Sequence, residues 1–278
     1  MVRPMHFHSA NEAWKTLAKH ILNYGTGVAP RGLKTLEISH ATLSFDMHVP
    51  VIACRDRKLS HRFMAAEPLW YLSGSDRLEE IAKYNPRMRE FSDDGETLYG
   101  AYGPPIKSQL DHVISALLGD RHTRQAWLSI WKPNPRKSKD IPCTIALGWR
   151  ISTGALHCHA YMRSSDTYLG VPYDWFSFCV LSAFVACFYN RAQSGPAERV
   201  RLGHLYFTAA SSHVYSGDEK AIRKLLSTRT KWVQSPVLMP SAIASGSWTR
   251  IEEGLVMRRN GLEPVATLFD CKPKWKGK

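Results

Sequence analysis

One run of the sequence constrains the fold more than any other. Residues 172–189 are mostly apolar and contain no glycine, and no proline after Pro172. A breaker-free run of this length predicts a helix, and a helix that is apolar all round is a buried one. Its most apolar part, 176–189, is shorter than the ~20 residues that cross a bilayer, and it contains Ser177 and Ser182. The chain therefore needs a core large enough to enclose this helix.

The rest of the chain alternates between helical and strand-like patterns without any linker composition. Helical spacing occurs at 9–24, 61–72 and 107–118. Strand patterns occur at 36–51 (with a turn near Asp46), 125–131, 143–149, 155–162 and 202–210. A basic loop at 132–140 separates two of these strands, and 85–105 is rich in Gly, Pro and Asp and predicts a loop. This mixture predicts a single α+β domain spanning residues 1–278.

The charge indicates an anionic partner. The chain has 37 Lys and Arg against 24 Asp and Glu, a formal net charge of +13, with four lysines in the tail at 271–278. Nucleic acid, a phosphorylated metabolite or an acidic surface would all fit. The chain lacks zinc-finger spacing, RNP-like aromatic motifs and a heptad-plus-basic region, so nucleic acid is not expected to be its main partner. Six scattered cysteines and a start without an apolar signal run predict reduced thiols in a cytoplasmic protein without a membrane segment.

The region around Cys143 carries the candidate chemistry. Cys143 follows Pro142 at the head of an apolar strand, and Arg163, Ser164 and Asp166 come one strand later. A guanidinium here could hold a phosphate in a fork and favour a thiolate. Taken alone, Cys143 also fits an inert core cysteine, which most lone cysteines are. Arg163 and Asp166 fit a buried structural ion pair as well as they fit a binding site.

Together with other residues, this region resembles the thymidylate synthase family, including the pyrimidine-nucleotide hydroxymethylases that share its fold. Pro142-Cys143 resembles the nucleophile motif of the family. Arg163-Ser164-x-Asp166 and the following Leu-Gly-Val-Pro-Tyr-Asp at 169–174 resemble its phosphate- and base-binding stretch. The further matches, in order along the chain, are Arg31, Glu67 in E-P-L-W-Y-L-S-G, Tyr102-Gly103, Arg124 and His213-x-Tyr215.

The resemblance implies a mixed β-sheet covered by helices, a homodimer through the sheet, a pyrimidine nucleoside monophosphate as substrate and 5,10-methylenetetrahydrofolate as the one-carbon donor. Cys143 would add to C6 of the base, which turns C5 from a poor nucleophile into an enamine-like carbon. Glu67 would relay protons through water. The resemblance implies that the phosphate is bound by Arg31, Arg163 and Ser164, and by an Arg124 that the partner subunit supplies across the dimer interface. His213 and Tyr215 would bind the sugar 3′-hydroxyl. Asp166 would face the pterin or support the site, and Tyr102 would lie next to the substrate loop.

One departure from the family pattern bears on the base. Asp174 stands where thymidylate synthases carry an asparagine that reads N3–H and O4 of uracil. Cytosine presents the reverse pattern, an N4 amino donor and an N3 acceptor, and a carboxyl can accept from N4 and, when protonated, donate to N3. Aspartate here marks the cytidylate hydroxymethylase branch. The alternative is a surface or helix-capping aspartate, because Asp174 begins a helical run.

Other departures concern the reaction outcome. Met88 and Phe91 stand where synthases tend to place tryptophans over the folate, and loss of that cover could admit water to an exocyclic methylene intermediate and yield a hydroxymethyl product. The lysine-rich tail has no counterpart of the short apolar C-terminus that seals the site of a synthase. The remaining differences are Thr144 for a histidine, Gln125 for a second interface arginine, and Ala209-Ala210-Ser211 for a Gly-Gly-Asp stretch.

The sequence therefore predicts a C5 hydroxymethyltransferase of dCMP or CMP without a metal site, and it leaves ribose and deoxyribose both open. One alternative is a thymidylate synthase that acts on dUMP, and another is a non-catalytic, basic nucleic-acid-binding protein. A metal site at His157-Cys158-His159 is a third. In a strand the two histidines share a face and Cys158 points away from it, which makes the triplet a poor chelate.

Overall fold

The computed structural model describes residues 5–227, 229–233 and 236–269. Its centre is an eight-stranded sheet in the order β1-β3-β8-β6-β5-β4, with β2 paired to β3 and β7 paired to β8. The strands are β1 (Met5–Phe7), β2 (Thr26–Val28), β3 (Thr35–Asp46), β4 (Trp127–Ser129), β5 (Thr144–Ser152), β6 (Ala155–Met162), β7 (Ser165–Asp166) and β8 (Arg201–Tyr215). The β1–β3, β6–β8 and β7–β8 pairs are parallel and the others are antiparallel. The prediction of a mixed sheet is confirmed.

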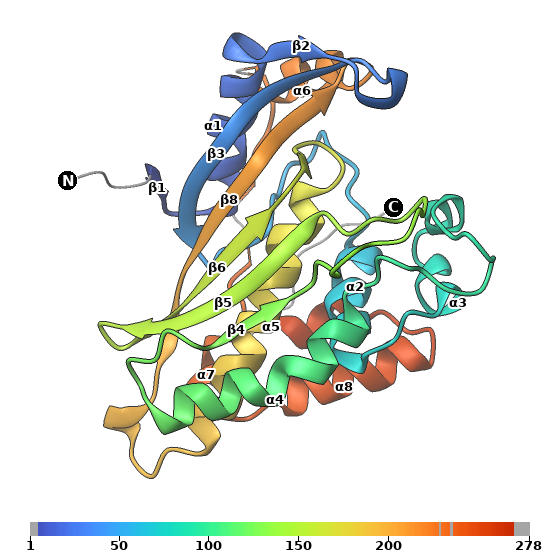
Figure 1. The fold of residues 1–278 in the computed structure, drawn as a ribbon. Helices are drawn as coiled ribbons and strands as arrows, with labels where there is room; N and C mark the ends of the chain where they lie inside the picture. Colours follow the sequence, from blue (N-terminus) through green and yellow to red (C-terminus); the bar gives the residue numbers. More distant parts are fainter. Residues whose placement is uncertain (1–4, 228, 234–235, 270–278) are drawn as a thin grey trace.

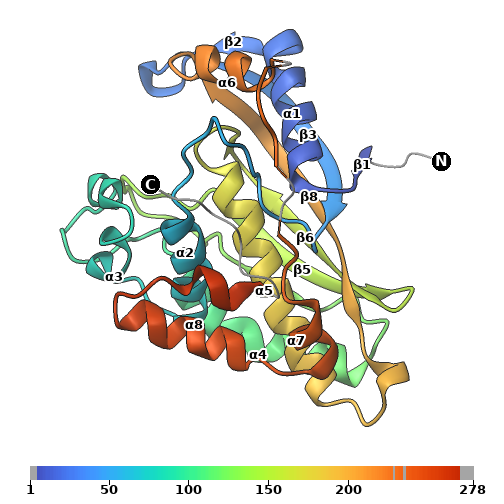
Figure 2. The same cartoon turned by 180° about the vertical axis from the view of Figure 1, so that it is seen from behind.

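The α-helices are α1 (Ala10–Tyr24), α2 (His61–Ser73), α3 (Leu78–Ala82), α4 (Gly103–Gly119), α5 (Val171–Arg191), α6 (Glu219–Leu225), α7 (Pro240–Ser245) and α8 (Thr249–Arg259). Four short 3-10 turns accompany them: η1 (Pro30–Gly32), η2 (Pro86–Glu90), η3 (Pro196–Glu198) and η4 (Pro264–Leu268). Helices α1, α2 and α5 lie on one side of the sheet, and α8 packs behind α2 (Figures 1 and 2). The core lies between this helical layer and the sheet.

Helix α5 runs through the middle of the helical layer. By length and hydropathy it could cross a membrane, but 78% of its most apolar window is buried inside the molecule. Trp175 at its start packs against Phe45 and Phe207, with ring centroids 4.9 and 5.4 Å apart. The prediction of a buried core helix is confirmed.

Most of the predicted elements occur, with shifted ends. Ser9 caps α1 by accepting a hydrogen bond from the backbone of Glu12, and Gly74 ends α2 in the left-handed conformation that favours glycine. The turn predicted near Asp46 is confirmed, since β3 ends there, but the structure has no strand at 47–51. Strand β8 continues five residues beyond the predicted end. The loop region expected at 85–105 contains the short turn η2, and its last three residues already belong to α4, which begins at Gly103. The helices α6, α7 and α8 were not anticipated.

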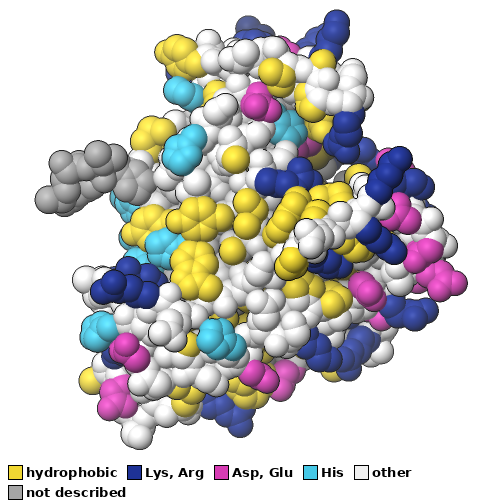
Figure 3. Space-filling model, in the orientation of Figure 1, with side chains coloured by type: hydrophobic (Ala, Val, Ile, Leu, Met, Phe, Trp, Pro, Cys, Tyr) yellow, Lys and Arg dark blue, Asp and Glu magenta, His cyan; other side chains and the backbone are white. Residues whose placement is uncertain are grey.

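The face of the sheet away from the helices carries aromatic and histidine side chains, and no described helix covers it (Figures 1 and 3). We refer to these side chains as the outer patch: His6, Trp127, His157, His159, Tyr161, His204 and Tyr206. Tyr161 is 43% exposed, and His159 stacks on Tyr206 at 5.0 Å. The strand geometry expected for residues 157–159 is confirmed, since Cys158 is fully buried on the opposite face.

Candidate active site

The nucleophile candidate lies where the start of β5 meets the end of β6. The backbone N–H of Arg163 donates to the carbonyl of Cys143. The guanidinium of Arg163 then returns over the same segment: Nε donates to Pro142 at 3.0 Å and Nη2 donates to Ile141 at 2.9 Å. Nη2 also lies 3.8 Å from the sulfur of Cys143. These contacts fix the Arg163 guanidinium against the segment that carries Cys143. Of its nitrogens, only Nη1 makes no hydrogen bond to this segment.

The state of the Cys143 sulfur is decided by burial. Burial raises the pKa of this thiol to about 11, although the Arg163 charge lowers it, and the nearby carboxyls of Asp174, Asp140 and Asp166 raise it further. The Arg163 guanidinium lowers the thiol pKa, as expected, but burial and the three carboxyls together raise it by more. At neutral pH the thiol form is therefore favoured, and any nucleophilic attack by this sulfur would require loss of its proton.

The first turn of α5 brings Asp174 into the same region. The N-cap of α5 is Gly170 and the helix has no side-chain cap, so the capping alternative for Asp174 is wrong. A Cβ on Gly170 would lie 3.2 Å from the Asp174 carboxyl, so glycine gives this carboxyl room. Burial raises the pKa of Asp174 well above its usual range, and the carboxyls of Glu67 and Asp166 raise it further. Asp174 is therefore a partly buried acid whose surroundings favour its protonated form.

Helix α2 faces α5 and supplies Glu67. This glutamate is 8% exposed, and its Oε2 accepts a hydrogen bond from the Ser177 hydroxyl at 3.2 Å. Burial raises the pKa of Glu67 to about 7, against hydrogen bonds from Ser177 and Tyr71 that lower it. A carboxyl that titrates near neutral pH can both take and give a proton, which is what a general acid–base needs.

Tyr102 lies between the acid Asp174 and the start of β5, next to Cys143. Its hydroxyl oxygen accepts hydrogen bonds from the backbone N–H and the side-chain hydroxyl of Thr144, at 3.2 and 3.0 Å. Burial raises the pKa of Tyr102 well above its usual range, with further contributions from Asp174 and Cys143. The tyrosine hydroxyl therefore lies, as a neutral group, near both the acid and the sulfur.

A second group of candidates lies at the end of β7 and β8. Asp166 pairs in register with His213, and its Oδ1 accepts from the backbone of Tyr168 and Leu169, which fixes the turn into α5. The His213 and Tyr215 rings meet edge to face at 5.3 Å. Arg31, exposed and at a φ of 55°, is near enough to contribute to lowering the pKa of His213. These residues and Ser164, which follows Arg163, approach one end of the sheet.

Arg124 lies apart from them. It is exposed in the turn between α4 and β4. Because Trp149 donates to Ala126, Arg124 is level with Ile151, eight residues along β5 from Cys143. At ~3.3 Å per residue this is a separation of about 25 Å. Arg124 does not reach the sulfur of its own chain.

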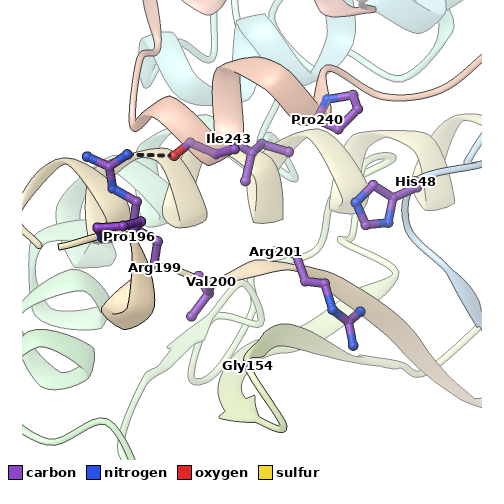
Figure 4. A pocket seen from close by; sticks show the side chains of 9 residues that line it. His48, Gly154, Pro196, Arg199, Val200, Arg201, Pro240 and Ile243 are labelled. Carbon is purple, nitrogen blue, oxygen red and sulfur yellow. Dashed lines mark hydrogen bonds between the residues drawn. The ribbon is translucent and has the colours of Figure 1, made fainter.

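A cavity of about 430 Å³ opens at the opposite end of β5 (Figure 4). It is lined by His48, Gly154, Pro196, Arg199, Val200, Arg201, Pro240, Ile243 and Ala244, and this described lining contains none of the predicted site residues. Within the described residues, no group of three or more His, Cys, Asp or Glu is arranged to hold a metal ion. The five described cysteines are free thiols, while Cys271 and the rest of the lysine-rich tail lie outside the described residues.

The gathering of Cys143, Arg163, Asp174, Glu67 and Tyr102 at one end of the sheet agrees with comparisons to known proteins. A sequence model described as thymidylate synthase matches residues 12–245. The chain belongs to the thymidylate synthase family. Its members are C5 pyrimidine one-carbon transferases.

Two relatives represent different branches of the thymidylate synthase family. The chain is 23% identical to a thymidylate synthase of Buchnera aphidicola subsp. Baizongia pistaciae over 253 residues, which are 86% of this chain and 90% of that protein. It is 26% identical to a deoxyuridylate hydroxymethyltransferase of Bacillus phage SP01 over 243 residues. That match covers 78% of this chain and 61% of the phage protein.

The sequence interpretation missed three residues in this family site. Tyr71 lies one helical turn after Glu67, and Ser177 lies three residues after Asp174, so helical periodicity alone could have placed them on the same faces. Arg57 is buried, donates to the carbonyl of Tyr168 and stacks over its ring at 4.3 Å. No motif points to Arg57, because only the folded chain brings it to the turn before α5.

Proposed function

We propose that this thymidylate synthase family member is a cytidylate 5-hydroxymethyltransferase, acting on dCMP or CMP with 5,10-methylenetetrahydrofolate and water. The observation that carries the proposal is Asp174, a partly buried acid near the Cys143 sulfur whose pKa is raised, so that its protonated form is favoured. A neutral carboxyl donates to N3 of cytosine through its hydroxyl and accepts from the N4 amino group through its other oxygen. The relative from phage SP01, a deoxyuridylate hydroxymethyltransferase by name, supports hydroxymethyl transfer within the family.

The reaction proposed for these residues begins at the sulfur. The thiol of Cys143 loses its proton and bonds to C6 of the base, and the electron pair of the C5–C6 double bond then makes C5 nucleophilic. Asp174 and Tyr102 stabilise the charge that develops at the position-4 edge of the base. After C5 has gained its one-carbon substituent, its hydrogen leaves as a proton, which Glu67 accepts through water. The one-carbon unit would then part from the folate nitrogen, with tetrahydrofolate as the leaving group, and a water oxygen would bond to it in exchange. The C6–sulfur bond would break last and restore the C5–C6 double bond.

The folate supplies the one-carbon unit. The described side chains near the β7–α5 turn and η2 suit a flat, partly apolar ring, since Leu169 and Phe91 are both 40% exposed. Met88 is partly buried against the core, so it offers less cover than the tryptophan that synthases tend to have there. We propose that Phe91 and Leu169, with Asp166, hold the folate.

The proposed activity is tested with purified protein, methylenetetrahydrofolate and 5-tritiated CMP, dCMP or dUMP. We expect folate-dependent tritium release from a cytidylate with a 5-hydroxymethyl product, at a kcat/KM at least about 100-fold above that for dUMP. Tritium release from dUMP alone, or a 5-methyl product formed together with dihydrofolate, would contradict the proposal.

We further propose that the protein forms a homodimer through the outer face of the sheet. We also propose that it acts in the cytoplasm. The outer patch presents ring surfaces that a second copy would cover, and Arg124 lies about 25 Å from the sulfur of its own chain. In a back-to-back dimer, each Arg124 would reach the nucleotide phosphate of the other subunit, alongside Arg31, Arg163 and Ser164. The free thiols of the described cysteines fit a reducing compartment.

Mixing a weakened variant with an inactive one tests this arrangement. Arg124→Ala alone is expected to lower kcat/KM about 10- to 100-fold, because a charge-assisted phosphate contact is lost. When Arg124→Ala and Cys143→Ala subunits exchange, about a quarter of the sites combine a native sulfur with a native arginine, so about a quarter of the parental activity should return.

Arg121→Ala is the matched control for this experiment, because Arg121 lies in the same turn and donates only to the carbonyl of Glu198. Arg121→Ala should have the same kcat/KM as the unsubstituted protein. When it is mixed with Cys143→Ala subunits, the activity should equal that of a mixture of the unsubstituted protein with Cys143→Ala. A fully active monomer in gel filtration, or no recovery after subunit exchange, would contradict the shared site.

A further inference from the structure

Tyr71 is a buried tyrosine in the middle of α2 that none of the motifs includes. We propose that it is a positioning residue for Glu67: its hydroxyl, together with that of Ser177, holds the Glu67 carboxyl in the orientation in which it exchanges protons with the pyrimidine. This inference rests on the proposed function and assigns one further residue to it.

The contacts of the Glu67 carboxyl carry the inference. Tyr71 follows Glu67 by one helical turn, so both side chains project from the same face of α2. Ser177 donates a hydrogen bond to the carboxyl from α5 at 3.2 Å, and the Tyr71 hydroxyl is placed to donate to the carboxyl from its own helix and lowers its pKa. Tyr71 is 5% exposed and Ser177 is fully buried. The carboxyl is therefore held from its own helix and from the opposing helix, where solvent does not compete for these bonds.

Tyr71 is itself held in place by the nucleophile strand. Its ring packs on the ring of Tyr102, with centroids 5.0 Å apart. The Tyr102 oxygen accepts two hydrogen bonds from Thr144, which uses both of its acceptor positions. Thr144 directly follows Cys143. The orientation of the Glu67 carboxyl is thus connected, through two tyrosines and a threonine, to the strand that bears the sulfur.

The surroundings of Glu67 set the direction in which its pKa would change. Asp174 and Tyr173 face it from α5, and Tyr71 from its own helix. Tyr102, at the start of α4, faces Tyr71. Burial raises the pKa of Glu67 to about 7, and the two hydroxyl donors stabilise the carboxylate and oppose that rise. Without the Tyr71 hydroxyl, burial is less opposed and the pKa increases.

Tyr71→Phe tests the proposal, because it keeps the ring on Tyr102 and removes only the hydroxyl. We expect the Glu67 pKa to rise by about one pH unit, both in the pH dependence of kcat and in a carbon-13 NMR titration of the carboxyl without nucleotide. At neutral pH kcat should fall roughly tenfold, while KM for the nucleotide stays within about twofold. Ser177→Ala should move the same pKa in the same direction.

Tyr84→Phe is the matched control, since the Tyr84 hydroxyl is also buried but donates to the Arg258 carbonyl, at 2.9 Å. It should leave the Glu67 titration unchanged. The proposal is overturned if Tyr71→Phe titrates like the unsubstituted protein, or if Tyr84→Phe shifts the pKa equally. Failure of the proposed function would instead appear as no turnover by the unsubstituted protein, and the NMR titration of the carboxyl would still decide the role of Tyr71. All variants are measured below their melting temperatures.

Discussion

Asp174→Asn is expected to transfer the base preference from cytosine to uracil, changing the ratio of the two kcat/KM values by roughly 10²- to 10⁴-fold. With cytosine, the proton of the neutral carboxyl lies between the carboxyl and N3, and the second oxygen accepts from the N4 amino group. Uracil carries its own proton on N3 and presents O4, which needs a donor. An amide has a donor for O4 in every state, whereas a carboxyl has one only while it is protonated. Binding of uracil would therefore need that proton on the carboxyl throughout, while binding of cytosine lets the proton lie on either partner. Steady-state rates with dCMP, CMP and dUMP measure the change.

Asp140→Asn separates base reading from a general electrostatic effect. Asp140 is also a buried acid with a raised pKa, and it also raises the pKa of Cys143, but its carboxyl accepts from the backbone of Gly100. Its replacement should change the rates with cytosine and uracil nucleotides by the same factor. If Asp174→Asn left the preference for cytosine intact, the assignment of Asp174 to the base, and with it the cytidylate proposal, would be wrong.

Cys143→Ala is expected to reduce turnover by on the order of 10⁴- to 10⁶-fold, because no other group can form the bond to C6. The same variant should lose the covalent adduct. A 5-fluorinated cytidylate carries fluorine where the substrate carries the C5 hydrogen, and fluorine cannot leave as a proton does. With this analogue and methylenetetrahydrofolate, the native protein should therefore accumulate a covalent adduct that is visible by intact mass. The thiol of Cys143 is also expected to alkylate slowly at neutral pH, since its pKa is about 11.

Cys54→Ala is the control for this variant. Cys54 is a free, partly buried cysteine whose pKa burial also raises. Its removal should leave both turnover and adduct formation unchanged. An adduct that persists in Cys143→Ala, or one that maps to a peptide containing Cys54, would exclude Cys143 as the nucleophile.

The helices that the sequence predicted best are those with local signals at both ends. Ser9 and Gly25 bound α1, and Gly74 bounds α2, so capping and backbone freedom decide these ends without tertiary contacts. The strands were less well defined: β3 does end at the turn predicted near Asp46, but no strand follows it at 47–51, and β8 extends to Tyr215 because Thr35 pairs with it across the sheet. The C-terminal helices α7 and α8 are short or weakly amphipathic and fold against α5 and α2, so their patterns carried little signal.

The chemical character of this site was readable in the sequence, because nucleophile, guanidinium and acid are fixed by residue type and spacing. What the sequence alone determined is this set of groups, the buried helix that carries Asp174, and the resemblance that places the chain in its family. The tertiary structure decided their states. Burial raised the pKa of the Cys143 thiol to about 11, raised that of Asp174 well above its usual range and moved that of Glu67 to about 7. These shifts depend on how much water and which charges surround each group, and that is settled only when α2, α5 and the sheet close around them.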